Sequence, residues 1–327
     1  AAFSGHPKQH QTQGRLLLLK QSYLAVVGGV NVDIAGTPDT SLLPGDSNPG
    51  RVTVTLGGVG RNIAENIRRL GRPVELVTAL GGDSHALQVR QSCRELGIGL
   101  SHSLVTPDGR TSTYLCMNDV DGDMVAAIAD MAICDRLTPA FLESQLDMLN
   151  GAGLVVLDAN LTEESLVYLA KHVTAPLAAD PVSVKKAVKL QSALPCLSLL
   201  KPNRPEASCL TGVPIGSHAD LPLAAEAFFR LGLKNVFISL GSEGVYFHDG
   251  RESGIVPCFH APIVNTSGCG DAFLAASAIA WADGCSLREA ARRGQAAAAV
   301  CAGFAGAVNP NMSAAALDNL LKGDKTP

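Results

Sequence analysis

The chain has 327 residues, of which 46% are hydrophobic and 17% charged, so it can bury a sizeable core and is neither disordered nor fibrous. Its formal net charge of −4 provides no diffuse positive field, which argues against a general DNA or RNA binder. No apolar run reaches the roughly 18 residues that a membrane-spanning helix needs, so we expect a small-molecule partner and neither nucleic acid nor membrane.

The nine cysteines are spread along the chain without a CxxC pair. This spacing lacks the signature of a zinc knuckle or of a redox motif. Free and mostly buried thiols are typical of a reducing environment, so the sequence predicts a cytoplasmic protein or one of another reducing intracellular compartment.

Residues 1–22 carry three basic side chains, Lys8, Arg15 and Lys20, and no acidic one. The apolar run 16–19 is too short for the hydrophobic core of a secretory signal. We therefore expect a linker or tail here, with a tag remnant or a processed leader as alternatives. The folded domain is predicted over residues 23–327.

From residue 23 onward, short apolar runs alternate with helical stretches. The helical spacing of Ile63, Ile67 and Leu70, followed by Gly71 as a left-handed cap, predicts a helix over 62–70. This alternation predicts an α/β fold with a doubly wound, mostly parallel sheet flanked by helices. The runs that read as its buried strands are 23–27, 74–80, 154–158, 177–180, 198–200 and 236–240.

Two segments, 36–56 and 111–130, break this alternation. In the first, Val52, Val54 and Leu56 alternate with polar residues, and the second contains the turn 121–123. Alternation of this kind around a tight turn indicates hairpins. We expect the two segments to form a small separate sheet.

The sequence Gly-Gly-Val-Gly-Arg-Asn at 57–62 follows a strand and opens the predicted helix. Clustered glycines let a ligand approach the backbone, and Asn62 has an amide that can bind a hydroxyl. A dinucleotide-binding turn is the alternative, although the full GxGxxG spacing is absent. The first strand leads to Asp33, whose carboxylate either binds paired sugar hydroxyls or serves a turn.

Two further segments follow predicted strands and allow two interpretations each. At 201–206, Asn203 is suited to cap a helix, or Glu206 holds the water shell of a magnesium ion. At 239–244, the two glycines form either a plain turn or the floor of a nucleotide site.

The segment 264–271, Val-Asn-Thr-Ser-Gly-Cys-Gly-Asp, is the most informative. Its small residues precede an apolar helical run, so their backbone N–H groups can converge on a phosphate at a helix N-terminus. Asp271 would repel a phosphate but is well suited to accept a proton from an attacking hydroxyl. The alternative is a glycine-rich turn in which Asp271 only complements the helix dipole. The sequence GxxxxGK[ST] is absent, which excludes a P-loop.

These four segments, in this order, resemble the ribokinase-like (PfkB) carbohydrate kinases over about residues 23–320. The resemblance implies an α/β core with a β-sheet lid, formed by the two irregular segments, and ATP-dependent phosphoryl transfer. It makes Asp271 the general base and the amides of Gly268, Cys269 and Gly270 the anion hole. Ser267 and Cys269 depart from the Thr and Ala usual in the family signature, and both are small enough for a backbone-lined hole.

The resemblance also implies the ligands. The substrate is bound by Asn31, Asp33, Gly58 and Asn62, and ATP by Asn203, Ser239, Gly241, Gly244, Gly268 and Gly270. Mg²⁺ is expected near Glu206 through water, and a monovalent cation such as K⁺ near Asn265, Ser267 and the 303–311 loop. Relatives often form homodimers through the lid.

Within the family, segments 46–50, 57–64, 179–183 and 200–204 look most like pseudouridine kinases. This implies phosphorylation of a C-nucleoside on its 5′-hydroxyl, with Asn48, Thr113 and Asp130 as candidates for base recognition. Some such relatives are fused to a pseudouridine-phosphate lyase. The alternatives are a kinase for ribose, adenosine or a ketosugar acid, and a non-catalytic nucleoside or sugar sensor, against which the intact Asp271 argues.

Overall fold

The computed structural model describes residues 23–323, so the linker or tail predicted at 1–22 lies outside the described residues. Its central sheet has the strand order β14-β13-β12-β11-β10-β9-β1-β4. All neighbours from β4 to β12 are parallel, and β13 and β14 add an antiparallel hairpin at one edge. The strands are β1 Leu24–Val27, β4 Val74–Val77, β9 Val155–Asp158, β10 Leu177–Asp180, β11 Leu199–Leu200, β12 Val236–Ser239, β13 Val245–His248 and β14 Ser253–Val256.

Each of the six predicted apolar runs contains one of the parallel strands. The run 74–80 was predicted too long, because β4 ends at Val77 and the chain then turns into β5 (Ala79–Leu80). β5 pairs with β6 (Leu104–Val105) in a separate two-stranded sheet. The hairpin of β13 and β14 was missed, since these short edge strands do not have the continuous apolar character of the buried ones.

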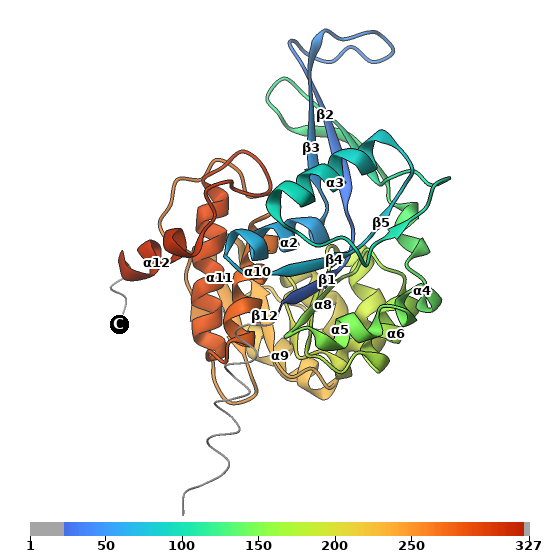
Figure 1. Cartoon of the computed structure of the whole chain (residues 1–327). Coiled ribbons are helices and arrows are strands. Elements are labelled where there is room, and N and C mark those ends of the chain that lie inside the picture. Colours follow the sequence, from blue (N-terminus) through green and yellow to red (C-terminus); the bar gives the residue numbers. More distant parts are fainter. Residues whose placement is uncertain (1–22, 324–327) are drawn as a thin grey trace, which may run out of the picture.

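Helices cover both faces of the central sheet, as a doubly wound fold requires (Figure 1). Successive residues of β1 point to opposite faces, so Ala25 joins one hydrophobic cluster and Val26 the other. The helices are α2 Val59–Arg69, α3 Ser84–Leu96, α4 Pro139–Glu143, α5 Leu146–Gly151, α6 Glu163–His172, α7 Val184–Ala187, α8 Arg204–Thr211, α9 Leu221–Arg230, α10 Cys269–Ala282, α11 Leu287–Ala302 and α12 Ala314–Gly323, with 3-10 turns at Ala132–Arg136, Val188–Cys196, His218–Asp220 and Gly241–Glu243.

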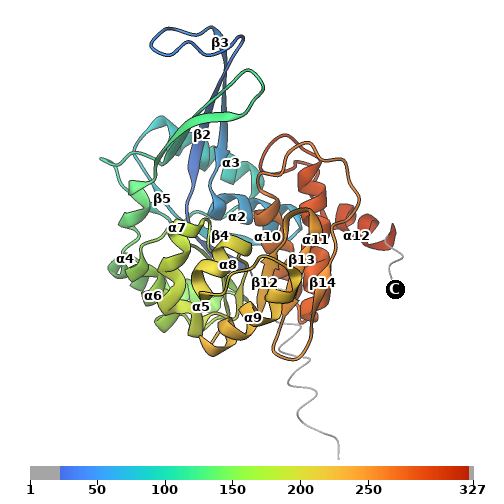
Figure 2. The same cartoon turned by 180° about the vertical axis from the view of Figure 1, so that it is seen from behind.

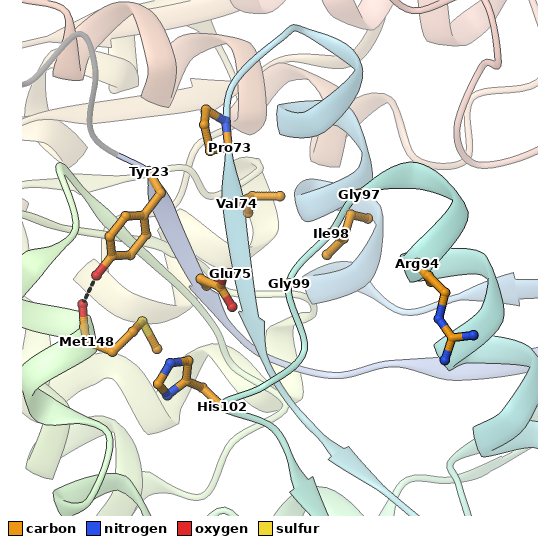
Figure 3. Close-up of a pocket in the computed structure, with 10 residues that line it drawn as sticks. All are labelled: Tyr23, Pro73, Val74, Glu75, Arg94, Gly97, Ile98, Gly99, His102 and Met148. Atoms are coloured by element: carbon orange, nitrogen blue, oxygen red, sulfur yellow. Dashed lines mark hydrogen bonds between the residues drawn. The ribbon is translucent and has the colours of Figure 1, made fainter.

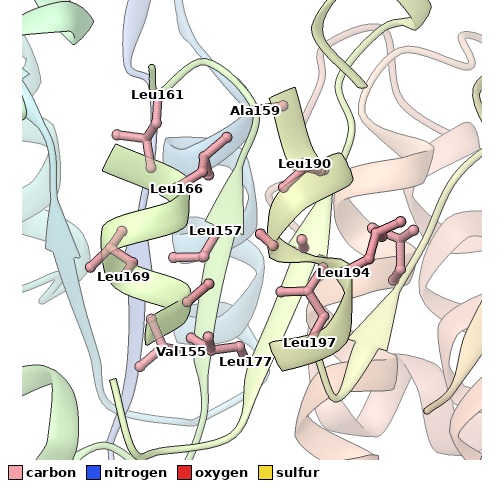
Figure 4. Packing of buried hydrophobic residues seen from close by; sticks show 14 of the residues in the cluster. Val155, Leu157, Ala159, Leu161, Leu166, Leu169, Leu177, Leu190, Leu194 and Leu197 are labelled. Carbon is pink, nitrogen blue, oxygen red and sulfur yellow. The ribbon is translucent and has the colours of Figure 1, made fainter. Parts of the chain in front are cut away.

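The first cluster lies under α6 and the 3-10 turn that follows α7 (Figure 4). Leu166 and Leu169 of α6 pack over β9, and Leu190 and Leu194 cover the neighbouring part of the sheet. All four are fully buried, and burying one such side chain stabilises a fold by about 1.5–3 kcal/mol. The second cluster lies under α2, α3, α10 and α11. The two layers hold the carboxyl ends of the strands in fixed positions.

A second, four-stranded sheet projects from the core (Figures 1 and 2). It has the order β3-β2-β7-β8, with β2 Asn31–Pro38, β3 Gly50–Gly57, β7 Thr113–Asn118 and β8 Met124–Asp130. The two irregular segments thus form one sheet, although β2 begins five residues before the predicted 36–56 segment. Within residues 23–323, no helix is long and apolar enough to cross a membrane.

Candidate active site

Polar residues gather where the parallel strands end. Asp158 and Asp180 are the last residues of β9 and β10, and Lys201 follows β11 directly. Because these strands are parallel neighbours, their carboxyl ends lie at one edge of the sheet. Open α/β sheets bind their ligands at this edge.

The glycine segment at 57–62 allows α2 to start against the loop that follows β1. Gly58 has φ +96°, and a Cβ on it would lie 2.6 Å from the carbonyl oxygen of Gly29. A Cβ on Gly60 would lie 2.8 Å from the carbonyl carbon of Gly28. Larger residues would separate the helix from the loop. α2 begins at Val59, three residues before the predicted start, and this places Asn62 in its first turn.

Asp271 lies in the first turn of α10 and is only 8% exposed. Its Oδ2 accepts a hydrogen bond of 2.9 Å from Nδ2 of Asn62, which is 209 positions away in the chain. The Oδ1 of Asn62 is buried without a hydrogen-bond partner among the described residues. A polar atom in this state is suited to accept a hydrogen bond from a bound hydroxyl.

The pKa of Asp271 is raised to about 8, mainly by burial and in addition by the nearby carboxylate of Asp180. The hydrogen bond from Asn62 and the charge of Lys201 act in the opposite direction, since both favour the ionised form. A carboxyl group with a pKa near neutrality is suited to exchange a proton with a substrate.

Lys201 is a site residue that the sequence reasoning did not single out. Its Nζ lies 3.1 Å from Oδ2 of Asp180, and both side chains are buried. Burial lowers the pKa of Lys201, but the charges of Asp180 and Glu206 outweigh this effect and raise it overall. A Cβ on Gly270 would lie 2.9 Å from Nζ, so the ammonium group stands beside the first turn of α10. The available signal was a lysine directly after a buried parallel strand.

The start of α10 provides backbone donors next to this cation. Gly268 is its N-cap with φ +76°, and a Cβ there would overlap the carbonyl oxygen of Ala307. Among the described residues, the amides of Gly268 and Gly270 donate to no protein acceptor. The amide of Cys269 donates to the carbonyl of Thr266 at 3.3 Å. Of the three amides expected in the anion hole, those of Gly268 and Gly270 therefore have no acceptor among the described residues, and that of Cys269 donates within a turn.

Asn203 and Glu206 form a capping box at the start of α8. Oδ1 of Asn203 accepts from the amide of Glu206, and Oε2 of Glu206 accepts from the amide of Asn203, both at 2.9 Å. The capping alternative is thus realised for both residues. Burial raises the pKa of Glu206. Residues 23–323 contain no group of three side chains able to hold a metal. These residues fit Mg²⁺ bound mainly by phosphates and water, with Glu206 in contact only through water.

The turn at 239–244 begins at the carboxyl end of β12, which neighbours β11 in the central sheet. Ser239 ends β12 and forms a bridge with Asn203. Gly244 has φ +106°, and a Cβ on it would overlap the carbonyl oxygen of Val256, so this glycine is required by the turn itself. Cys258 lies beside this turn, because its Sγ donates to the carbonyl of Gly241 at 3.4 Å.

The residues expected to hold a monovalent cation are engaged with neutral donors. Nδ2 of Asn265 donates to the carbonyl of Ala305 at 2.6 Å, and its Oδ1 accepts from the amide of Ser267 at 3.0 Å. The Sγ of Cys301 donates to the carbonyls of Ser267 and Ala307 at 3.6 and 3.3 Å. The backbone carbonyl of Asn265 accepts from no backbone amide among the described residues, and a carbonyl in contact with a thiol keeps a second lone pair, so a monovalent cation at this loop stays a prediction.

On the substrate side, Asn31 and Asp33 lie at the base of the second sheet. Nδ2 of Asn31 donates to Oδ1 of Asp33, and burial raises the pKa of Asp33. A Cβ on Gly57, in the neighbouring strand, would overlap the Asp33 carboxylate, which explains this glycine. Asp33 was expected at a strand end, but it is the third residue of β2.

Of the three residues proposed for base recognition, Asn48 lies in the loop between β2 and β3, whereas Thr113 and Asp130 lie at the base of the second sheet, in the same row as Val32. The amide of Asn48 is used within its own loop, where it accepts from the amide of Leu43 at 2.8 Å and donates to the carbonyls of Leu43 and Asp46. Thr113 and Asp130 are register partners on β7 and β8, and Asp130 is exposed. Among the described residues, the side chains of Thr113 and Asp130 form no hydrogen bond with Asp271.

A pocket of about 570 Å³ lies at the opposite edge of the central sheet, at the amino ends of β1 and β4 (Figure 3). Tyr23, Glu75, His102 and Met148 are among its lining residues, and the hydroxyl of Tyr23 donates to the carbonyl of Met148. It contains none of the predicted site residues. The candidate site is therefore the cluster at the carboxyl ends of the strands.

The carboxyl ends of the strands thus bring together a glycine-rich helix start, a carboxyl group and a lysine, and the comparisons with known proteins show that the chain is an ATP-dependent phosphotransferase. The model of the pfkB family carbohydrate kinases matches residues 21–314, and the chain belongs to this family. The kinase activity and the fold class expected from the sequence are confirmed.

Several relatives are similar over nearly the whole chain. The pseudouridine kinase of Escherichia coli is 34% identical, and the alignment covers 93% of this chain and 97% of the relative. An uncharacterized sugar kinase of the same organism is 36% identical over 93% of this chain and 84% of its own. The structure of Arabidopsis thaliana ribokinase complexed with ribose and ATP has a TM-score of 0.83 at 26% identity, covering 92% of this chain and 99% of the other.

Proposed function

We propose that this kinase phosphorylates the 5′-hydroxyl of pseudouridine, with Asp271 as the general base. The observation that carries the proposed mechanism is the hydrogen bond between Asn62 and Asp271 at the start of α10. The choice of substrate is supported by the segments that resemble pseudouridine kinases and by the similarity to the Escherichia coli protein of that name.

In this mechanism Asp271 accepts the proton of the attacking hydroxyl, and Asn62 holds its carboxylate in place. The unpartnered Oδ1 of Asn62 accepts a hydrogen bond from a substrate hydroxyl. The amides of Gly268 and Gly270 and the ammonium of Lys201 stabilise the negative charge on the transferred phosphoryl group. Glu206 would contact the water shell of Mg²⁺, and the ion would supply positive charge next to the phosphates. No step requires a monovalent cation.

Substrate choice is expected to depend on the second sheet, which would close over the base as a lid. A pseudouracil ring carries an N–H where uracil in uridine has a carbon. A site that hydrogen-bonds this group rejects the analogue that lacks it, by up to roughly 10⁴-fold. We expect pseudouridine to give a much higher kcat/KM than uridine, ribose or adenosine, measured by ADP release under one magnesium concentration.

The alternatives within the family have different outcomes in the same assay. A higher kcat/KM for ribose, adenosine or a ketosugar acid would contradict the pseudouridine assignment and leave the kinase mechanism intact. Binding of a nucleoside without any turnover would contradict the mechanism as well and favour a sensor. The intact cluster of Asp271, Asn62 and Lys201 argues against the sensor.

The homodimer implied by the resemblance is proposed to form over the outer face of the second sheet. Val54, Leu115 and Ile128 lie in one row across this sheet, on β3, β7 and β8. They are 53%, 42% and 68% exposed, so the row is an apolar strip without a partner within the described chain. Apolar strips of this kind mark protein interfaces.

Replacing Ile128 with aspartate is expected to convert a dimer into a monomer, because a charge would be buried in the interface. Light scattering coupled to gel filtration measures the change in mass. Ala127→Asp is the matched control, since the neighbouring side chain on the same strand points to the opposite face. Equal masses for the Ile128 variant and the parent would contradict an interface at this face.

A further inference from the structure

Three of the nine cysteines converge beside the phosphate-binding start of α10. Only three cysteines of the chain are buried, so the expectation of mostly buried thiols was wrong. Cys269 is the first residue of α10, Cys301 lies in the last turn of α11, and Cys258 lies between β14 and α10. The Sγ of Cys269 donates to the carbonyl of Ala298, one helical turn before Cys301 on α11, at 3.5 Å, and Cys269 packs against the buried cluster that contains Cys301. Two helices packed side by side therefore bring the two thiols close together at the proposed active site.

The two thiols differ in their access to solvent. Cys269 is half-buried, and Cys301 has no exposed surface. A partly exposed thiol at the N-terminus of a helix is the reactive type, and a buried thiol close to it is placed to resolve the oxidised product. Cys258 is exposed, but its Sγ contacts the carbonyl of Gly241 at 3.4 Å, and no thiol hydrogen bond joins it to Cys269 among the described residues.

Cys301 also connects the segments around the anion hole. Its Sγ donates to the carbonyls of Ser267 and Ala307 at 3.6 and 3.3 Å. The carbonyl of Ala307 lies against Gly268, where a Cβ would overlap it. A change at the Cys301 sulfur thus acts directly on the backbone that positions the amides of Gly268 and Gly270.

We propose that Cys269 and Cys301 are a modification site, at which a hydroperoxide forms a reversible disulfide that closes the phosphate-binding site. The sulfur of Cys269 attacks the peroxide, the O–O bond breaks, and the sulfur is oxidised to a sulfenic acid while the other oxygen leaves with a proton as water or an alcohol. The sulfur of Cys301 then attacks the sulfenic acid, the S–S bond forms, and the hydroxyl group leaves as water with the thiol proton of Cys301.

The disulfide removes the thiol proton of Cys301, so its hydrogen bonds to Ser267 and Ala307 are lost. The disulfide also links the start of α10 covalently to the end of α11. Amides that stabilise a transferring phosphoryl group must be held in place to be effective, so we expect kcat to fall by about tenfold or more. Bound ATP would cover Cys269 and slow the reaction. A dithiol reductant reverses it.

The experiment follows the disulfide and the activity separately. The reduced enzyme is treated with hydrogen peroxide, free thiols are blocked, and peptides are mapped by mass spectrometry. We expect a cross-linked peptide containing Cys269 and Cys301, a parallel loss of turnover, and recovery of both with dithiothreitol. Cys301→Ala should not form the cross-link, whereas Cys258→Ala, which removes the third nearby thiol, should behave like the parent.

The inference rests on the proposed kinase site only for its effect on turnover. Absence of the 269–301 cross-link from the oxidised parent protein overturns the modification site, even if Cys301→Ala does not fold. A cross-link that leaves turnover unchanged overturns the closure of the site. A failure of the kinase mechanism itself would instead appear as a lack of turnover in the fully reduced protein.

Discussion

Replacing Asp271 with asparagine is expected to lower kcat by about 10²–10⁴-fold, because an amide cannot accept the hydroxyl proton. Asparagine retains the shape of the side chain and an oxygen that can accept from Nδ2 of Asn62. Nucleotide binding and the folded state should therefore persist, as checked by ATP titration and circular dichroism. Asp249→Asn is the matched control, since Asp249 caps a turn between β13 and β14. A kcat within tenfold of the parent would contradict the general-base assignment.

The raised pKa of Asp271 predicts how activity depends on pH. The group has a pKa of about 8 in the folded protein and an ordinary value of 3.8. A general base acts when it is deprotonated, so kcat/KM should rise with pH and level off above about pH 8. The free energy of unfolding changes with pH in the opposite direction to kcat/KM. The folded carboxyl holds its proton while the unfolded one is ionised, so the parent loses stability as the pH rises from about 4 to 8.

The Asp271→Asn variant has no proton to lose at this position. Its free energy of unfolding should therefore exceed that of the parent by a margin that grows between about pH 4 and pH 8. Urea denaturation at several pH values measures this margin. A margin independent of pH would show that the carboxyl is not held in its protonated form.

Replacing Lys201 with methionine is expected to affect both stability and turnover. Methionine leaves the buried carboxylate of Asp180 without its partner, which costs about 3–5 kcal/mol in the free energy of unfolding. It also removes the positive charge beside Gly270, so kcat should fall by about 10²–10³-fold. Urea denaturation and steady-state kinetics measure the two effects.

A second variant separates the two roles of Lys201. In Lys201→Met combined with Asp180→Asn, the carboxylate that forms the ion pair is removed together with the lysine, and asparagine can still accept from the amide of Val182. Val182 needs this support because it has φ +66°, an unfavourable conformation for a β-branched residue. We expect the double variant to recover most of the stability but not the turnover. Recovery of both would mean that Lys201 is only a structural partner of Asp180.

Local patterns in the sequence were sufficient for much of the fold. Each of the parallel strands of the central sheet was predicted, because a strand buried on both faces needs an uninterrupted apolar run. The start of α10 was recognised because small residues before an apolar helix are a local signal. The hairpin of β13 and β14 and the separate pairing of β5 were not predicted. Edge strands and short pairings depend on neighbours that are distant in the sequence.

The sequence by itself determined the glycines, the aspartate and the asparagine of the site and their order along the chain. Only the tertiary structure decided which of them meet. Asn62 reaches Asp271 across 209 positions, and Lys201 reaches Asp180 and Gly270, because helices packed on a parallel sheet bring the ends of separate strands together. The pKa of Asp271, the use of Glu206 as a cap and the proximity of Cys269 to Cys301 arise from burial and packing, which no local pattern specifies.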